Sequence, residues 1–121
     1  MEITLKQTGH ERYLTIMKIL GSISNPAIRP FNVLRHRELE VFAILVHMYN
    51  ETYSDLSEEE RFEKLFSYET RIEISTKLGH LSMDSVYNIM MNLRKHGLIT
   101  KTQLVKGYIL PKTSHLKINF E

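Results

Sequence analysis

Residues 71–99 of the chain read RIEISTKLGHLSMDSVYNIMMNLRKHGLI. In the first third of this stretch, Ile74 and Leu78 stand four residues apart, which places both on one face of a helix. Gly79 follows directly, and glycine is the residue that most often ends a helix. We therefore predict a helix over 69–78.

A second helix is predicted directly after it. Ser82 is a favoured N-cap residue, because its hydroxyl can accept a hydrogen bond from a free backbone N–H of the first turn. Gly97 again marks a helix end, so this helix is expected over 83–96. Its inward positions recur at helical spacing and are all apolar: Val86, Ile89, Met90 and Leu93.

Beyond Gly97 the apolar pattern changes from a period of 3.6 toward a period of 2, which is typical of strands. We expect short strands over three segments, 99–105, 108–110 and 116–120. Residues 106–107 and residues 111–114 both have the composition of a hairpin turn, and the sequence does not distinguish between them.

The N-terminal half carries two further helical patterns. The first predicts a helix over 10–20 that ends at Gly21, with an apolar face made of Tyr13, Ile16, Met17 and Leu20. The second predicts a central helix over 35–50 that is buried on most sides. Its apolar positions are Leu39, Val41, Phe42, Ile44, Leu45, Val46, Met48 and Tyr49. A loop over 22–32, which contains Pro26 and Pro30, separates the two helices, and residues 2–6 alternate weakly like a short strand.

Residues 57–60, Ser-Glu-Glu-Glu, have the form of a capping box at the start of a short helix. The apolar side of that helix would consist of Phe62, Leu65 and Phe66. Acidic side chains in a first turn are favoured by the helix dipole. Structural capping therefore explains these glutamates better than a metal-binding or catalytic role does.

Charge is distributed unevenly along the chain. Residues 1–50 carry a net charge of +2, residues 51–69 a net charge of −5, and residues 70–121 a net charge of +5. A basic C-terminal block is what a phosphate-binding surface requires, although a solvated lysine-rich face has the same composition.

Composition indicates one soluble, intracellular domain. The 121 residues suit a single core, and 42% of them are hydrophobic. The N-terminus has no apolar segment typical of a signal peptide, and the longest apolar run, 41–46, is too short to span a bilayer. The chain has no cysteine, which excludes disulfides, thiolate zinc sites and cysteine nucleophiles.

The stretch 71–99 resembles the winged helix-turn-helix superfamily, in the style of the MarR-like regulators. The resemblance covers residues 34–121 and leaves 1–33 as an N-terminal helical extension. It implies a mainly α fold with a small C-terminal β-hairpin or sheet. The positions that carry it are Arg37 to Val41, Ile74, Ser75, Leu78, Gly79, Ser82, Val86, Ile89, Met90, Leu93 and Gly97 to Ile99.

Such a fold implies binding of double-stranded DNA, with the helix over 83–96 in the major groove and the wing over 99–112 on phosphates. The outward side chains of that helix are the candidates for base contacts, since amide, hydroxyl and apolar groups can all read base edges. They are Met83, Asp84, Ser85, Tyr87, Asn88, Met91 and Asn92. The candidate phosphate contacts are Arg94, Lys95, Lys101, Lys106 and Lys112.

Two features depart from the superfamily pattern. Three residues, 80–82, separate Gly79 from the second helix, one more than in most relatives. The second helix also carries Asp84, and no Arg or Lys, in its first two turns, whereas Arg or Lys to guanine is the commonest specific contact. The alternative is therefore a protein-interaction module that uses the same helix face. Tyr87 and Met91 would then contact a partner or pack on the N-terminal helix.

Enzyme activity is not predicted, and no cofactor or metal is expected. No two of the six histidines have the i, i+4 spacing of a helical metal site, and the chain has no Gly-rich phosphate loop or nucleophile elbow. For the apolar face of the helix over 10–20 we expect one of two roles, a contact in a homodimer or a cover for the chain's own core.

Overall fold

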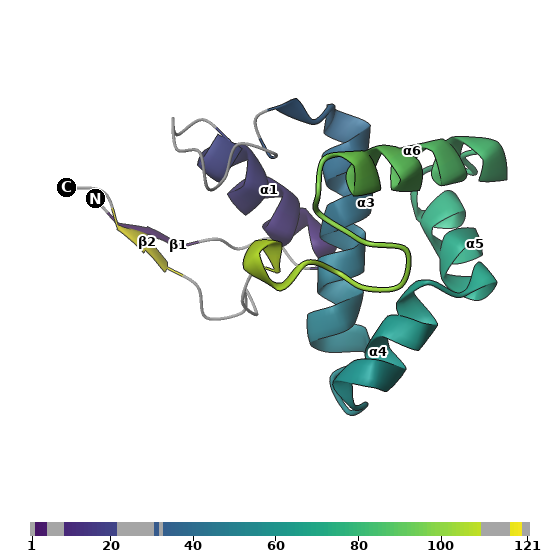
Figure 1. Ribbon diagram of the computed structural model, residues 1–121. Helices are drawn as coiled ribbons and strands as arrows, with labels where there is room; N and C mark the ends of the chain where they lie inside the picture. The colour runs from purple at the N-terminus through teal and green to yellow at the C-terminus, as the bar shows by residue number, and fades with distance from the viewer. Residues whose placement is uncertain (1, 5–8, 22–30, 32, 110–116, 120–121) are drawn as a thin grey trace.

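A computed structural model of the chain describes residues 2–4, 9–21, 31, 33–109 and 117–119 (Figure 1). These residues are mainly helical, as the sequence predicts. They form five α-helices and two short strands. The helices are α1 (His10–Gly21), α3 (His36–His47), α4 (Glu58–Leu65), α5 (Tyr68–Lys77) and α6 (Met83–Lys95), and the strands are β1 (Glu2–Thr4) and β2 (Lys117–Asn119).

Helix α3 lies at the centre of the helical part. Figure 1 shows α1 on one side of α3 and the α5–α6 pair on the other, with α4 beyond its C-terminal end. Nearly every residue from Leu39 to Val46 is buried, and most of these side chains are apolar, so the helix needs neighbours on several sides. The predicted central helix is confirmed, except that α3 ends at His47 and continues as one π-helical turn, Met48–Thr52.

Helix α1 covers α3 with its apolar face. Tyr13, Ile16 and Met17 are buried there. The Tyr13 hydroxyl donates a hydrogen bond of 2.9 Å to Glu51 Oε2, and His47 Nδ1 lies 3.0 Å from the same oxygen. Of the two roles expected for this face, the structure shows packing within the chain.

A serine caps each of the three helices that follow. Ser57, Ser67 and Ser82 accept a hydrogen bond from the backbone N–H three residues later, at 3.3, 3.3 and 3.1 Å. The caps at Ser57 and Ser82 were predicted, and the cap at Ser67 was missed, so α5 begins one residue before the predicted start. The capping box also differs in detail, because the Ser57 hydroxyl donates to the Glu60 carboxylate at 3.0 Å.

The turn between α5 and α6 contains two successive left-handed residues, Gly79 with φ 76° and His80 with φ 63°. The Leu81 N–H donates to the Ser75 carbonyl at 3.1 Å, and the Ser75 hydroxyl donates to the Leu81 carbonyl. The small Ser75 side chain therefore holds the turn against α5. Three residues, 80–82, separate Gly79 from α6, and the first of them, His80, takes the left-handed conformation that non-glycine residues rarely adopt.

The segment after α6 differs from the prediction. Residues 99–105 are not one strand, because the chain folds back at Thr100–Gln103 and pairs Ile99 with Leu104 in a single antiparallel bridge. The Thr100 N–H donates to the Gln103 carbonyl at 2.8 Å, and the Val105 N–H donates to the Leu98 carbonyl at 3.0 Å. The physical reason is the apolar-polar-apolar order of the segment, since folding at the four polar residues buries the apolar residues on both flanks.

The rest of the predicted β-structure is also rearranged. The first proposed turn, 106–107, lies in a short 3₁₀ helix, Lys106–Tyr108, and the second, 111–114, lies outside the described residues. The segment predicted as a strand over 116–120 contains β2, which pairs antiparallel with β1 and places Ile118 opposite Ile3. Within the described residues, the bridge between Ile99 and Leu104 is all that exists of the expected hairpin.

Candidate nucleic-acid interface

Helix α6 has one buried side and one exposed side. Val86, Met90 and Leu93 are buried toward the core, as predicted, whereas Ile89, which was also predicted to point inward, is only partly buried. Tyr87 and Met91 lie on the opposite side, with 57% and 37% of their surface exposed. The other exposed residues of this helix are polar or charged: Asp84, Asn88, Arg94 and Lys95.

The seven predicted base-contacting residues fall into two groups. Asp84, Tyr87, Asn88 and Met91 are exposed, whereas Met83, Ser85 and Asn92 are partly buried. Ser85 belongs to the helix cap, because its hydroxyl accepts a hydrogen bond of 2.8 Å from the Ser82 hydroxyl. The structure therefore brings four of the seven together on an open surface.

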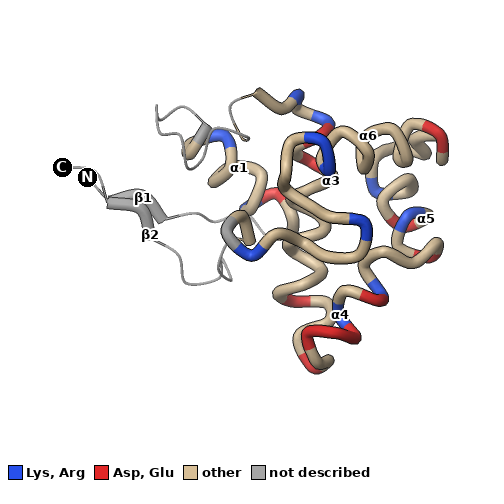
Figure 2. Tube along the Cα trace, viewed as in Figure 1, with Lys and Arg blue, Asp and Glu red and all other residues tan. Residues whose placement is uncertain are grey.

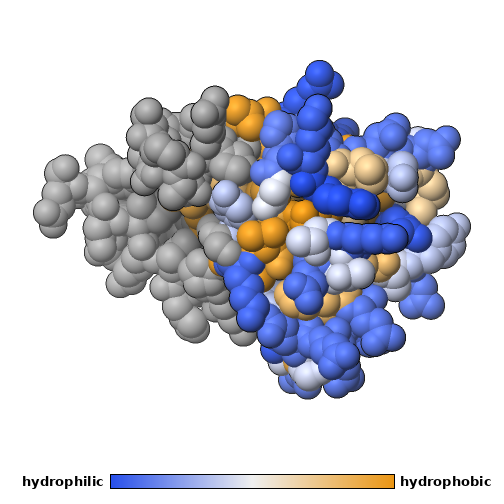
Figure 3. Space-filling model, in the orientation of Figure 1, coloured by the Kyte–Doolittle hydropathy of each residue, from blue (hydrophilic) through white to orange (hydrophobic). Residues whose placement is uncertain are grey.

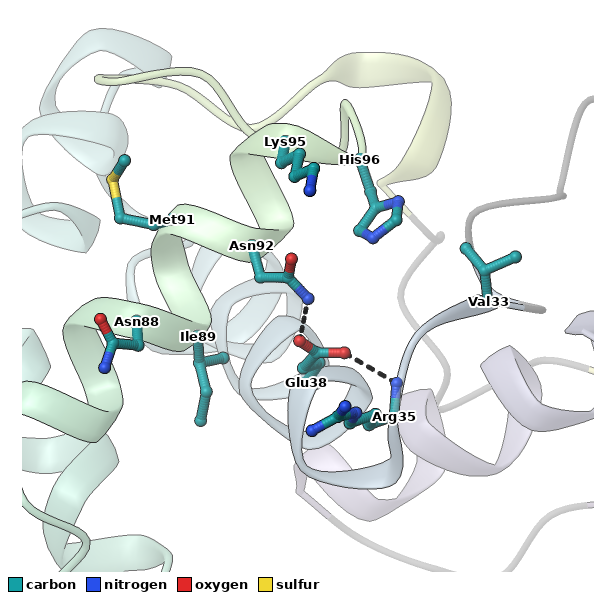
Figure 4. Close-up of a pocket in the computed structure, with 9 residues that line it drawn as sticks. All are labelled: Val33, Arg35, Glu38, Asn88, Ile89, Met91, Asn92, Lys95 and His96. Atoms are coloured by element: carbon teal, nitrogen blue, oxygen red, sulfur yellow. Dashed lines mark hydrogen bonds between the residues drawn. The ribbon is translucent and has the colours of Figure 1, made fainter.

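Asn92 has a partner inside the protein. Its side-chain amide donates to Glu38 Oε2, while Glu38 Oε1 accepts a hydrogen bond of 2.8 Å from the Arg35 backbone N–H (Figure 4). Glu38 is only 8% exposed, and its carboxylate joins the start of α3 to the last turns of α6. Sequence reasoning missed Glu38, although a glutamate three residues after the N-cap position is a recognisable capping pattern.

A groove separates α6 from the start of α3 and has a volume of about 730 Å³. We call it the α3–α6 groove. Two cationic side chains stand at it, Arg35 from the start of α3 and Lys95 from the end of α6 (Figure 4). Its lining consists of Val33, Arg35, Glu38, Asn88, Ile89, Met91, Asn92, Lys95 and His96.

We call the exposed side of α6, formed by Asp84, Tyr87, Asn88 and Met91, the exposed ridge. A much smaller pocket, of about 70 Å³, lies on the other side of this ridge from the α3–α6 groove. We call it the cationic pocket, because three basic side chains from three different segments line it: Arg71 of α5, Arg94 of α6 and Lys101 of the 100–103 turn. The remaining lining residues are Phe66, Tyr87, Met90, Met91, Ile99 and Thr100, so no carboxylate takes part. On the face seen in Figure 3, strongly hydrophilic residues stand beside small apolar areas over α6 and the chain after it.

The five predicted phosphate contacts are also divided. Arg94, Lys95 and Lys101 are exposed at the end of α6 and in the following turn. Lys106 instead forms an ion pair of 3.1 Å with Glu58 of α4, and Lys112 lies outside the described residues. Figure 2 shows this separation, with Lys and Arg at the C-terminal end of α6 and in the loop after it, and acidic residues over α4.

Comparisons with protein-family models, with curated proteins and with solved structures found no match for this chain. In the described ranges, no three His, Asp or Glu side chains come together in a way that would hold a metal ion. None of the helices that the structure describes combines the length and the apolar character needed to cross a bilayer.

Proposed function

We propose that this protein binds double-stranded DNA as a transcription regulator or accessory factor inside the cell, with α6 in the major groove. The observation that carries the proposal is the position of the cations around α6. Arg35 and Lys95 stand on one side of its exposed ridge, and Arg71, Arg94 and Lys101 stand on the other. A helix in the major groove has a phosphate backbone on each side. Cations on both sides of the exposed ridge therefore match the positions of the two phosphate backbones.

The exposed ridge supplies groups that can read bases. Asn88 can pair with adenine through two hydrogen bonds, and the Tyr87 ring and the Met91 thioether can contact a thymine methyl group. Asp84 can accept a hydrogen bond from the cytosine amino group. The helix pair α5–α6, its tight turn and the bridged 99–104 segment support the winged helix-turn-helix class for this protein.

The test is a fluorescence-anisotropy titration with random-sequence duplexes across a salt series. We expect affinity to fall steeply with salt, with a contribution of about −0.9 to the log–log slope from each phosphate neutralised. Lys95→Gln should weaken binding to all duplexes, whereas Lys64→Gln removes the same charge from α4 and should leave binding unchanged. Absence of binding to diverse duplexes at low salt would refute the proposal.

A second candidate function is docking of a protein partner by α5 and α6. The observation that favours it is a set of exposed apolar side chains on these helices: Tyr68 (60%), Ile72 (43%), Tyr87 (57%) and Met91 (37%). Under this alternative, Tyr87→Ala or Met91→Ala abolishes capture of the partner, whereas Lys101→Ala and Lys106→Ala do not affect it. The opposite pattern in a pull-down would count against docking of a protein partner.

A further inference from the structure

The cationic pocket brings together side chains that are distant in sequence. Arg71 comes from the second turn of α5, Arg94 from the last turn of α6, and Lys101 from the turn that follows. From the sequence, Arg94 and Lys101 are predicted as separate phosphate contacts, and Arg71 is not among the predicted contacts. All three side chains line one small pocket, so a single ligand there could contact them together.

A local contact orients the Arg71 side chain, and the backbone positions of Arg94 and Lys101 are fixed by the fold. The Arg71 guanidinium lies over the Tyr68 ring, 5.8 Å from its centroid. Lys101 sits in a turn that the Thr100 hydroxyl closes by accepting a hydrogen bond of 3.1 Å from the Gln103 N–H. Arg94 is anchored through α6, whose neighbouring Leu93 is fully buried. The three side chains therefore start from defined backbone positions.

The pocket favours an anion. Among the residues that the structure describes, none of the three cations forms an ion pair within the fold, and no acidic side chain lines the pocket. Phe66, Met90 and Ile99 form apolar walls, which weaken the screening of charge by water. Three like charges gathered in this way repel one another, and an anion between them relieves the repulsion. The volume suits a single tetrahedral oxyanion and not a nucleotide.

We propose that Arg71, Arg94 and Lys101 bind one and the same backbone phosphate of the DNA. This inference rests on the proposed function. Arginine suits the role because its guanidinium can donate two parallel hydrogen bonds to a phosphate. Because Tyr87 and Met91 line the same pocket, a phosphate bound there sets the register of the exposed ridge of α6 against the bases.

The salt dependence of binding distinguishes one shared phosphate from three. The variant Arg71→Gln/Arg94→Gln/Lys101→Gln should have a log–log salt slope shallower than that of the wild type by about 0.9. Three separate phosphate contacts would reduce the slope by about 2.7, and no contact would leave it unchanged. Either of these results would overturn the inference. The effects of Arg71→Gln and Arg94→Gln on affinity should also be less than additive.

The matched control removes three charges elsewhere. Lys18→Gln, Lys64→Gln and Lys77→Gln together change exposed lysines on α1, α4 and the end of α5. We expect this control to retain the wild-type salt slope. If the control reduces the salt slope as much as the first variant does, the reduction is a general effect of charge, and the inference of a shared phosphate is overturned.

A second measurement separates this inference from the proposed function. Inorganic phosphate is added without DNA at low salt, and the Nε–Hε resonances of Arg71 and Arg94 are followed by NMR. We expect both resonances to shift with one saturation curve. If they do so while the wild type binds no duplex, the proposed function fails and the pocket takes free phosphate instead of a DNA phosphate. If they shift independently or not at all, the shared site is overturned whether or not DNA binds.

Discussion

Replacement of Asn92 by alanine tests the contact that fixes α6 on α3. The Asn92 amide donates to the carboxylate of Glu38, which is 8% exposed and also accepts from the Arg35 N–H. In Asn92→Ala, Glu38 keeps the bond at the start of α3 and loses the one to α6. The buried carboxylate then has one hydrogen-bond partner fewer in the folded state. This destabilises the fold, because in the unfolded chain water satisfies the same carboxylate fully.

The magnitude follows from two opposing terms. A hydrogen bond to a charged group contributes about 1.5–3 kcal/mol, and its loss lowers the free energy of unfolding by that amount. Alanine favours a helix interior over asparagine by about 0.6 kcal/mol, which partly offsets the loss. The Glu38 carboxylate also lines the α3–α6 groove, where water can replace the amide, so we expect the lower end of the range. The net loss is then about 1 kcal/mol.

Asn88→Ala is the matched control for the same substitution. Asn88 lies one turn earlier on α6 and is exposed. Its replacement carries the same gain in helix propensity without the loss of the bond to Glu38, so the variant should be slightly more stable than the wild type. Urea unfolding should therefore separate the midpoints of the two variants by about 1 M. Equal midpoints would refute the account of Glu38 as the group that joins α3 to α6.

Three further predictions concern other parts of the fold. Gly79→Ala should lower the free energy of unfolding by about 1–2 kcal/mol. An added Cβ would meet no atom within 4 Å, so the loss comes from placing alanine in a left-handed backbone conformation, with φ at +76°. His80→Gly should raise the free energy of unfolding, and a decrease measured by urea unfolding would contradict this. Tyr13→Phe removes the 2.9 Å hydrogen bond from the hydroxyl of the fully buried Tyr13 to Glu51, and it should lower the free energy of unfolding by about 1.5 kcal/mol. An unchanged melting temperature would contradict this expectation. Burial is the main cause that holds the pKa of His10 below its ordinary value of 6.5, so the folded state resists protonation. Because the unfolded state then binds more protons, the wild type should lose stability as the pH falls below 6.5, and His10→Gln should lose less; equal pH profiles would count against this assignment.

Sequence reasoning located the helices well, because each carries its own signal. The apolar residues of α3 surround the helix, and the inward positions of α6 recur at a period of 3.6. Ser57 and Ser82 mark two starts, and Gly79 marks an end. These signals lie within a few residues of one another and depend on local backbone geometry. They require no knowledge of the remaining chain.

The segment 99–105 shows where such reasoning fails. Its apolar residues can be matched to a strand, yet burial of Leu98, Ile99 and Leu104 against the core favours a fold at the polar residues between them. The missed cap at Ser67 has a different cause. Its hydroxyl donates to the Lys64 carbonyl at the end of α4, at 2.7 Å, and also accepts from the Thr70 N–H at the start of α5. One residue therefore closes one helix and caps the next, with no longer loop between them to mark the boundary.

For the candidate site, the apolar period of α6 is enough to predict that this helix has an exposed ridge, because it leaves Asp84, Tyr87, Asn88 and Met91 outside. The residues that lie beside that ridge could not be predicted in the same way, because distant segments supply them. Asn92 meets Glu38 across 54 residues, and Arg71 meets Arg94 and Lys101 at one pocket. Such meetings depend on how α3, α5 and α6 pack together. Helical periodicity predicts which side of its own helix a side chain lies on. It does not predict which residue of a distant segment that side chain contacts.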